Sequence, residues 1–234
     1  VKNVSYFAFT ATPKNKTMEL FGTRTGAGRS YFHKYSMKHA IEEGFIVNPL
    51  LCYTIYNDTY RITRKKSDEK EYDSARAQAA ILNYVTTSDE VIEKKTKIII
   101  DDFMTRRRNW LDGKAKAMIV TPSRKHAVCY RLAVDRYLKD CGCNFRACVA
   151  FTGNIDFAGE KHSEESMNKG FRENDIKALI RNNDDVRIII VADKLQTGFD
   201  EPRLCVMYID KKLNSPVKTV QTISRLNRPA RNKM

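Results

Sequence analysis

The chain has 234 residues, of which 42% are hydrophobic and 30% are charged, and this globular composition excludes wholesale disorder and fibrous repeats. Lysine and arginine number 42 against 28 aspartates and glutamates, a net charge of +14 that favours nucleic acid as a partner. No apolar run of about 18 residues and no secretory signal occurs, so we expect a cytoplasmic protein with no membrane partner. The six cysteines and four histidines lack paired zinc-ligand spacings, so we expect no metal site.

The first part of the chain predicts few regular elements. Residues 4–9 read as a strand, and because a domain seldom opens on a strand, this start predicts a piece of a longer protein. Residues 14–40 are polar with several glycines and predict a loop or linker, followed by a short helix ending near Gly44. Valine, isoleucine, tyrosine and threonine predict a strand within 45–62, and a charged connector follows over 65–73.

A long helix is predicted over residues 88–109. Thr87 and Glu90 have the spacing of a capping box, and apolar residues follow at helical intervals. Three arginines stand at the predicted end, where positive charge is favourable to the helix dipole.

From residue 115 onward, apolar strands alternate with helices. The strands are apolar on both faces, which predicts an α/β fold with a parallel sheet covered by helices on both sides. The predicted strands are 115–120, 146–151, 186–191 and 204–209, and the predicted helices begin after Ser123 and span 174–182 and 216–227.

Short polar signatures follow the predicted strands, where ligands of parallel sheets bind. Hydroxyl side chains and backbone N–H groups at helix starts bind anions well. Each signature has a purely local alternative: Ser123 as a helix N-cap, and Thr152 with Gly153 as a turn. Five signatures in register along one sheet edge nevertheless favour a binding site. They are residues 10–13, 121–123, 151–153, 193–200 and 221–228.

The last predicted helix carries Gln221, Arg225 and Arg228 at positions i, i+4 and i+7, which places them in one narrow stripe. Paired arginines can bind the β- and γ-phosphates of a nucleotide and stabilise charge that develops during hydrolysis. The alternative is an amphipathic helix with a solvated basic face. The absence of any acidic residue from Lys211 to Met234 favours the phosphate-binding interpretation.

Residues 22–30 look like a phosphate loop but do not match its G-x4-G-K-[ST] pattern. No glycine lies five positions before Gly28, Arg29 replaces the lysine, and no apolar strand precedes the loop. The acidic pair Asp101–Asp102 lies inside a predicted helix. The chain therefore lacks the phosphate-binding lysine and the magnesium-binding acid of a nucleoside triphosphatase.

The phrases TGFDEP (197–202) and QTISRLNR (221–228) together resemble the restriction (R) subunit of type I restriction–modification enzymes, a superfamily-two helicase-like motor. FTATPK (9–14) resembles helicase motif III, and MIVTPS (118–123) resembles motif IV. Residues 35–46 resemble the family's segment between its two motor domains, whereas 53–112 carry little of the resemblance.

This resemblance implies a RecA-like parallel sheet with helices on both faces, preceded by a helical and loop connector. Residues 1–22 would be the end of the first RecA-like domain with motif III. Residues 23–113 would be a connector with strands and a long helix, and residues 114–234 the second RecA-like helicase domain with motifs IV–VI.

The resemblance also assigns roles to single residues. Arg225 and Arg228 would be catalytic, and Thr10 and Thr12 would couple the two motor halves. The ATP-binding residues would be Gly198, Asp200, Gln221, Arg225 and Arg228. The DNA-binding residues would be Thr121, Ser123, Thr152, Gly153, Lys194 and Thr197.

By the same resemblance, the parent protein would be an ATP-dependent DNA translocase and endonuclease that uses ATP and Mg²⁺, with the Mg²⁺ ligands outside this chain. Its partners would be double-stranded DNA and the specificity and methylation subunits. We expect this chain alone to be inactive. Two alternatives stay open: another superfamily-two DNA-repair or RNA helicase, and a non-enzymatic basic module that binds nucleic acid, which the missing phosphate loop favours.

Overall fold

The chain forms two compact units, residues 1–51 and 52–234. Within the residues described, no helix has the length and apolar character needed to cross a bilayer. The computed structural model describes residues 3–10, 13–46, 48, 53–56, 85–169, 175–195 and 198–228.

The first unit contains regular structure where a loop was predicted over 14–40. Helix α1 (Asn15–Phe21) is followed by the antiparallel strands β1 (Thr23–Thr25) and β2 (Gly28–Ser30), and then by α2 (Met37–Glu42). These short elements escape periodicity arguments because they bury almost no side chains. The β1–β2 hairpin replaces the strand–loop–helix geometry of a phosphate loop, as the sequence indicated.

The strand predicted at residues 4–9 is wrong, because this segment is irregular and Phe9 is 95% exposed. A strand needs a neighbour to satisfy its backbone groups, and none of the described residues pairs with this segment. The strand predicted within 45–62 is also absent from the described residues 45–46, 48 and 53–56. The rest of that prediction and the 65–73 connector lie outside the described residues.

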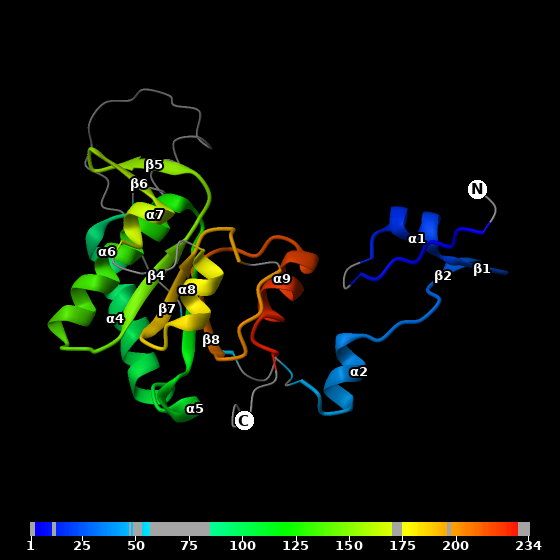
Figure 1. Cartoon of the computed structure of the whole chain (residues 1–234), viewed down its shortest axis with the longest axis horizontal. Helices are drawn as coiled ribbons and strands as arrows, with labels where there is room; N and C mark the ends of the chain where they lie inside the picture. Colours follow the sequence, from blue (N-terminus) through cyan, green and yellow to red (C-terminus); the bar gives the residue numbers. More distant parts are fainter. Residues whose placement is uncertain are drawn as a thin grey trace, which may run out of the picture. The chain divides into compact units, whose positions relative to one another are not determined.

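The second unit is built on a four-stranded parallel sheet, as the alternating apolar runs predicted (Figure 1). The strand order is β4–β7–β3–β8, and each strand lies within two residues of its predicted bounds. The strands are β3 (Lys116–Val120), β4 (Arg146–Ala150), β7 (Val186–Val191) and β8 (Leu204–Ile209).

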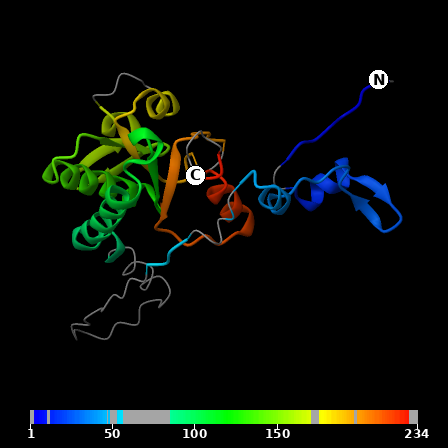
Figure 2. The same cartoon turned by 90° about the horizontal axis from the view of Figure 1, so that it is seen from below.

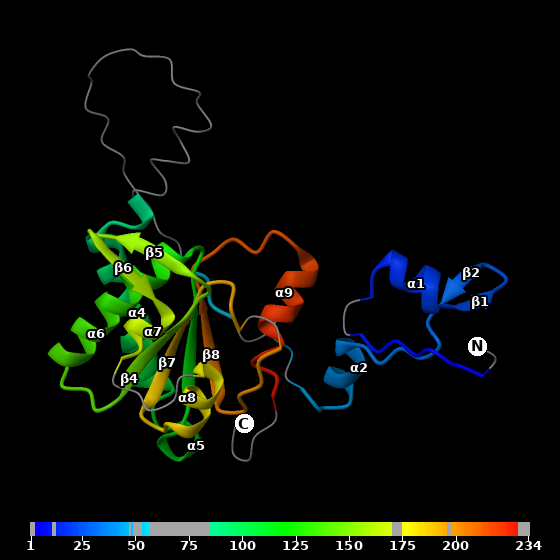
Figure 3. The ribbon, with the colours of Figure 1, turned by 45° about the horizontal axis from the view of Figure 1, so that its top comes forward.

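Helices cover both faces of the sheet, which confirms the α/β, RecA-like prediction. Ile119 and Ile190 point to the face packed against α4 (Asp89–Arg106) and α6 (Arg124–Asp140). The alternate residues Met118, Val120, Ile189 and Val191 point to the face that packs against α8 (Ile176–Asn182). Figure 3 shows α4 and α6 together on one side of the sheet and α8 on the other.

Helix α4 belongs to the packed sheet unit, because Ile92, Ile99, Ile100 and Phe103 are buried in the core that it shares with α6. The predicted connector boundary at residue 113 therefore runs through a packed unit, just after the short helix α5 (Trp110–Gly113).

The predicted capping box of α4 is wrong. The N-cap is Ser88 rather than Thr87, and the Ser88 hydroxyl donates to the Val85 carbonyl at 2.8 Å instead of capping the helix. The helix ends at Arg106, three residues before its predicted end.

Several smaller elements complete the unit. The hairpin of β5 (Asn154–Phe157) and β6 (Glu160–Ser163) and the short helix α7 (Glu164–Met167) were not predicted. Helix α9 spans Pro216–Ile223, so it ends four residues before the predicted 227. Figure 2 shows α9 on the side of β8 away from α4 and α6.

Candidate functional site

Arg225 and Arg228 lie just beyond α9: Arg225 is in a tight turn and Arg228 follows it in irregular backbone, so neither is in the predicted α-helical stripe. The N–H of Arg225 donates to the Thr222 carbonyl, and the N–H of Leu226 donates to Ile223, both in the i→i+3 pattern. Leu226 packs against the core on the α8 face, which draws the turn toward the sheet. Packing of the partly buried Leu226, rather than helix periodicity, therefore places the turn that carries Arg225.

These turns meet residues 198–200. The Arg225 Nη1 donates to the Phe199 carbonyl at 2.8 Å, and the Arg228 Nε pairs with Asp200 Oδ1 at 3.2 Å. Gly198 is exposed and has φ +65°, a conformation that side-chain-bearing residues rarely adopt. The structure thus brings together four of the five residues predicted to bind ATP.

The fifth, Gln221, is half-buried on α9 one turn before Arg225. Burial and the adjacent charge of Arg228 lower the pKa of Arg225, and Asp200 opposes this shift. Arginine stays cationic at physiological pH, so two guanidiniums lie close together beside residues 199 and 200. Two adjacent guanidiniums suit an anion such as phosphate.

The arginine cluster lies over the α8 face and not at the carboxyl edge of the sheet. Leu195 and Phe199 are buried in the core on this face, so the crossover from β7 to β8 runs across it. The prediction of five signatures along one edge is therefore wrong for residues 198–200 and 221–228. A parallel connection must return to the start of the next strand, and residues 198–200 lie on that return path from β7 to β8, where the turns after α9 meet them.

At the carboxyl edge, Thr121 is fully buried and its hydroxyl donates to the Val191 carbonyl at 3.0 Å. Its side chain has no surface for DNA, because it ties the end of β3 to β7. Ser123 is the N-cap of α6: its hydroxyl accepts the N–H of His126 at 3.4 Å and lies 2.8 Å from His126 Nδ1. The local alternative for Ser123 is thus realised, although the residue remains partly exposed.

Thr152 and Gly153 are exposed just after β4, on a turn held by a side chain that sequence reasoning missed. Arg124 Nη1 donates to the carbonyls of Thr152 and Asn154, both at 3.2 Å. Gly153 has φ +77°, and a Cβ there would lie 3.1 Å from the same Nη1. The only sequence feature that could have pointed to Arg124 is its position directly after the motif at 118–123.

Lys194 lies between Asp193 and Leu195, two residues with positive φ. Its ammonium contacts both carboxylate oxygens of Glu164, at 2.7 and 2.9 Å. Glu164 also accepts the backbone N–H of Phe151 at 3.0 Å, which links the ends of β4 and β7 through α7. Sequence reasoning missed Glu164 because the partners are 30 residues apart.

The remaining predicted residues are less informative. Thr10 is exposed in the irregular segment of the first unit. Thr12 and Thr197 lie outside the described residues.

Comparisons with known proteins agree with the motifs. The family described as type I restriction enzyme subunit R domain 3 matches residues 150–233. The putative MjaVIIP endonuclease subunit of Methanocaldococcus jannaschii is 30% identical over 97% of this chain, which covers 24% of that relative. The putative MjaVIIIP subunit from the same organism is 27% identical over 100% of the chain, which covers 25% of it.

The type I restriction enzyme HindI endonuclease subunit of Haemophilus influenzae is 29% identical over 99% of the chain, which covers 22% of that relative. The chain therefore spans about a quarter of the length of the curated relatives that it matches. Together with the parallel α/β sheet and the meeting of residues 198–200 with Arg225 and Arg228, these matches show that the chain belongs to the R-subunit family of type I restriction enzymes.

Proposed function

We propose that this chain is part of an ATP-driven DNA translocase within a type I restriction endonuclease, where it supplies one half of the ATPase cleft and part of the DNA-backbone track. One observation carries the proposal: Arg225 and Arg228 contact Phe199 and Asp200, so the two motifs assigned to the nucleotide are adjacent. DNA-stimulated ATP turnover by full-length subunits altered at these arginines tests the proposal.

The arginine pair has the chemistry for a phosphoryl-transfer site. A guanidinium is a planar fork that can bind two phosphate oxygens at once, and it neutralises charge that develops on a transferring phosphoryl group. The Phe199 carbonyl orients Arg225, and the Asp200 carboxylate orients Arg228. Phosphate oxygens would compete with Asp200 for Arg228, which gives the cluster a way to respond to nucleotide.

Only part of a complete nucleotide site fits the described residues. Mg²⁺ neutralises phosphate charge in such enzymes, and a phosphate-loop lysine binds the β- and γ-phosphates. Residues 22–30 form a hairpin with Arg29 in place of that lysine. We therefore place the lysine and the Mg²⁺ ligands elsewhere in the full-length subunit, with specificity and methylation subunits as its further partners.

The purified chain is accordingly expected to hydrolyse no ATP above background, even with DNA and Mg²⁺ present. Steady-state phosphate release measures this, and a full-length subunit serves as the positive control. Robust DNA-stimulated turnover by the chain alone would show that the nucleotide site has been placed wrongly.

The carboxyl edge of the sheet is proposed as the DNA-backbone track. Ser123, Thr152, Gly153 and Lys194 are exposed or partly exposed there, and Arg124 joins them. Thr121 is left out because its side chain is buried. Contacts to phosphates carry no base sequence, which suits a motor that moves along any DNA.

DNA binding by the chain is expected to be weak, non-specific and steeply dependent on salt. With about four phosphate contacts, affinity falls by about two orders of magnitude between 50 and 200 mM salt. Arg124→Ala should reduce the log–log slope by about one. Arg136→Ala, which removes another exposed arginine of α6, one paired with Glu93 of α4, is the matched control. An affinity that ignores salt, or that prefers one sequence strongly, would contradict phosphate binding.

A further inference from the structure

An ion pair between a buried glutamate and a partly buried arginine immediately follows residues 198–200 in the chain. Glu201 is 3% exposed, and its two carboxylate oxygens bind the guanidinium of Arg203, with Nε–Oε1 at 2.7 Å and Nη2–Oε2 at 2.9 Å. The Arg203 backbone N–H also donates to Oε1 at 3.1 Å. Pro202 stands between the two residues and fixes its own φ. Glu201 and Arg203 therefore form a bidentate ion pair within one short turn.

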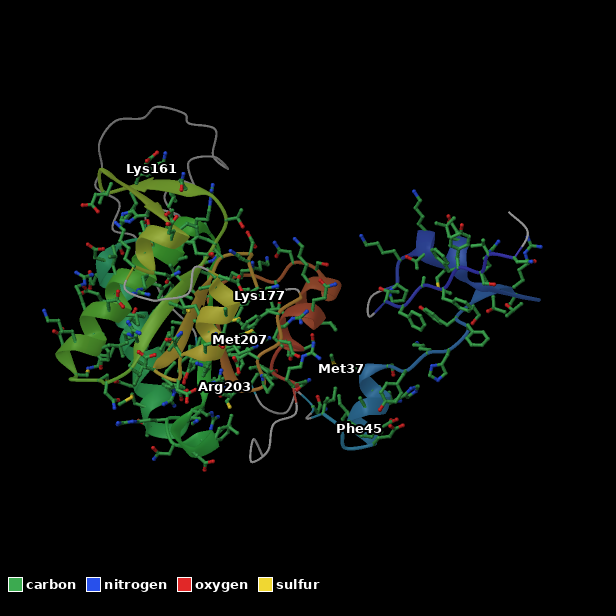
Figure 4. The ribbon with its side chains drawn as sticks, in the orientation of Figure 1. Met37, Phe45, Lys161, Lys177, Arg203 and Met207 are labelled. Carbon is green, nitrogen blue, oxygen red and sulfur yellow. The ribbon has the colours of Figure 1, made fainter. Side chains whose placement is uncertain are left out.

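The same guanidinium reaches the end of α8. Nη1 pairs with Asp184 at 2.7 Å, and Nη2 donates to the carbonyls of Arg181 at 2.8 Å and Ile180 at 3.3 Å. Those carbonyls end a helix, where the dipole favours positive charge. Figure 4 labels Arg203 beside α8 and β8. Arg203 thus links the connection between β7 and β8 to the C-terminal end of α8.

The residues just before this turn are the ones that contact Arg225 and Arg228. Asp200 precedes Glu201, and the contacts of Arg228 and Arg225 are the Asp200 carboxylate and the Phe199 carbonyl. A displacement of Glu201 would therefore move both acceptors. We propose that Glu201 and Arg203 are positioning residues that set the geometry of Arg225 and Arg228; this inference rests on the proposed function of that pair.

Glu201→Gln in the full-length subunit tests the inference. Loss of the carboxylate leaves the partly buried Arg203 charge without its two-point partner, which loosens the turn. We expect ATP turnover (kcat) to fall by about 10- to 100-fold with little change in KM, because misplacing a group by about 1 Å has effects of this size. A thermal melt confirms that the variant is folded.

A double-mutant cycle separates positioning from a merely structural role. If Glu201 acts through the arginine pair, Glu201→Gln adds little to the loss already caused by Arg225→Ala. Multiplied losses in the double variant, or normal turnover in Glu201→Gln, would overturn the inference. Normal turnover in Arg225→Ala would instead overturn the proposed function itself, so the two failures are distinguishable.

Asp184 provides a second variant that preserves the buried carboxylate. Asp184→Asn weakens one Arg203 contact and should lower kcat less than Glu201→Gln, in the same direction. Its neighbour Asp185 pairs with Arg146 at 2.6 Å and is the matched control, expected to keep normal turnover as Asp185→Asn. Equal effects from the two variants would count against a specific role for the Arg203 network.

Discussion

Replacement of Arg225 or Arg228 by alanine in the full-length subunit is expected to lower DNA-stimulated ATP turnover by about 10³-fold or more. The guanidiniums lie together beside Phe199 and Asp200, where they can neutralise charge on phosphate oxygens. This stabilisation is greatest in the transition state, so the loss should appear mainly in kcat. Steady-state kinetics with saturating DNA measures it.

Two controls make this result specific. Lysine at either position retains the charge but not the planar fork, so it should restore turnover only in part. Arg136→Ala removes an exposed arginine on α6 and should leave turnover unchanged. Circular dichroism should show intact folding, since Leu226 still anchors the turn in the core. Near-normal turnover in both alanine variants would favour the solvated basic surface instead.

The pH dependence of stability is expected to differ sharply between the chain and its Lys116→Met variant. Lys116 is fully buried, and its ammonium donates to the carbonyls of Asn183, at 2.8 Å, and Val186. Burial, reinforced by the charge of Arg203, lowers the pKa of Lys116 to about 8, from an ordinary 10.5.

Between those two values the unfolded chain binds more protons than the folded chain, so this lysine makes stability rise with pH. Its destabilising effect is fully present below about pH 8 and disappears as the pH rises through 10.5. From pH 7 to pH 10, the free energy of unfolding of wild type should gain roughly 2 to 3 kcal/mol relative to Lys116→Met.

The difference between the two proteins is the quantity to measure, because other groups titrate in the same range. Burial raises the pKa of the Cys148 thiol to about 12, and its ionisation in the unfolded chain opposes the effect of Lys116. Urea unfolding of both proteins at each pH cancels this shared contribution. A difference that stays constant from pH 7 to pH 10 would show that Lys116 does not titrate as its burial implies.

The sheet was predictable from the sequence because its strands are apolar at nearly every position, as in Val186–Val191, where all six residues are buried. The β5–β6 hairpin was not predictable in this way, since its strands have only four residues each and no buried side chain, and only Ile155 and Phe157 in β5 alternate with polar residues. Residues 4–9 show the opposite failure: they are apolar but find no strand partner among the described residues.

The sequence predicted which residues form the candidate site better than it predicted where on the sheet they lie. Motif resemblance identified Asp200, Arg225 and Arg228, which do meet. Their location over the α8 face depends on the burial of Phe199 and on the packing of Leu226 against the same core, which single-sequence patterns do not reveal. Partners such as Glu164 for Lys194 and Asp184 for Arg203 also escaped, because ion pairs between distant residues leave no local signal.

The most direct test of the arginine pair is a structure of the full-length subunit bound to DNA, Mg²⁺ and ADP with a γ-phosphate mimic such as beryllium fluoride. We predict guanidinium nitrogens of Arg225 and Arg228 within about 3 Å of the oxygens or fluorines at the γ position. Nucleotide phosphates bound elsewhere, with both arginines still in contact with Phe199 and Asp200, would contradict a role for this chain in the ATPase cleft.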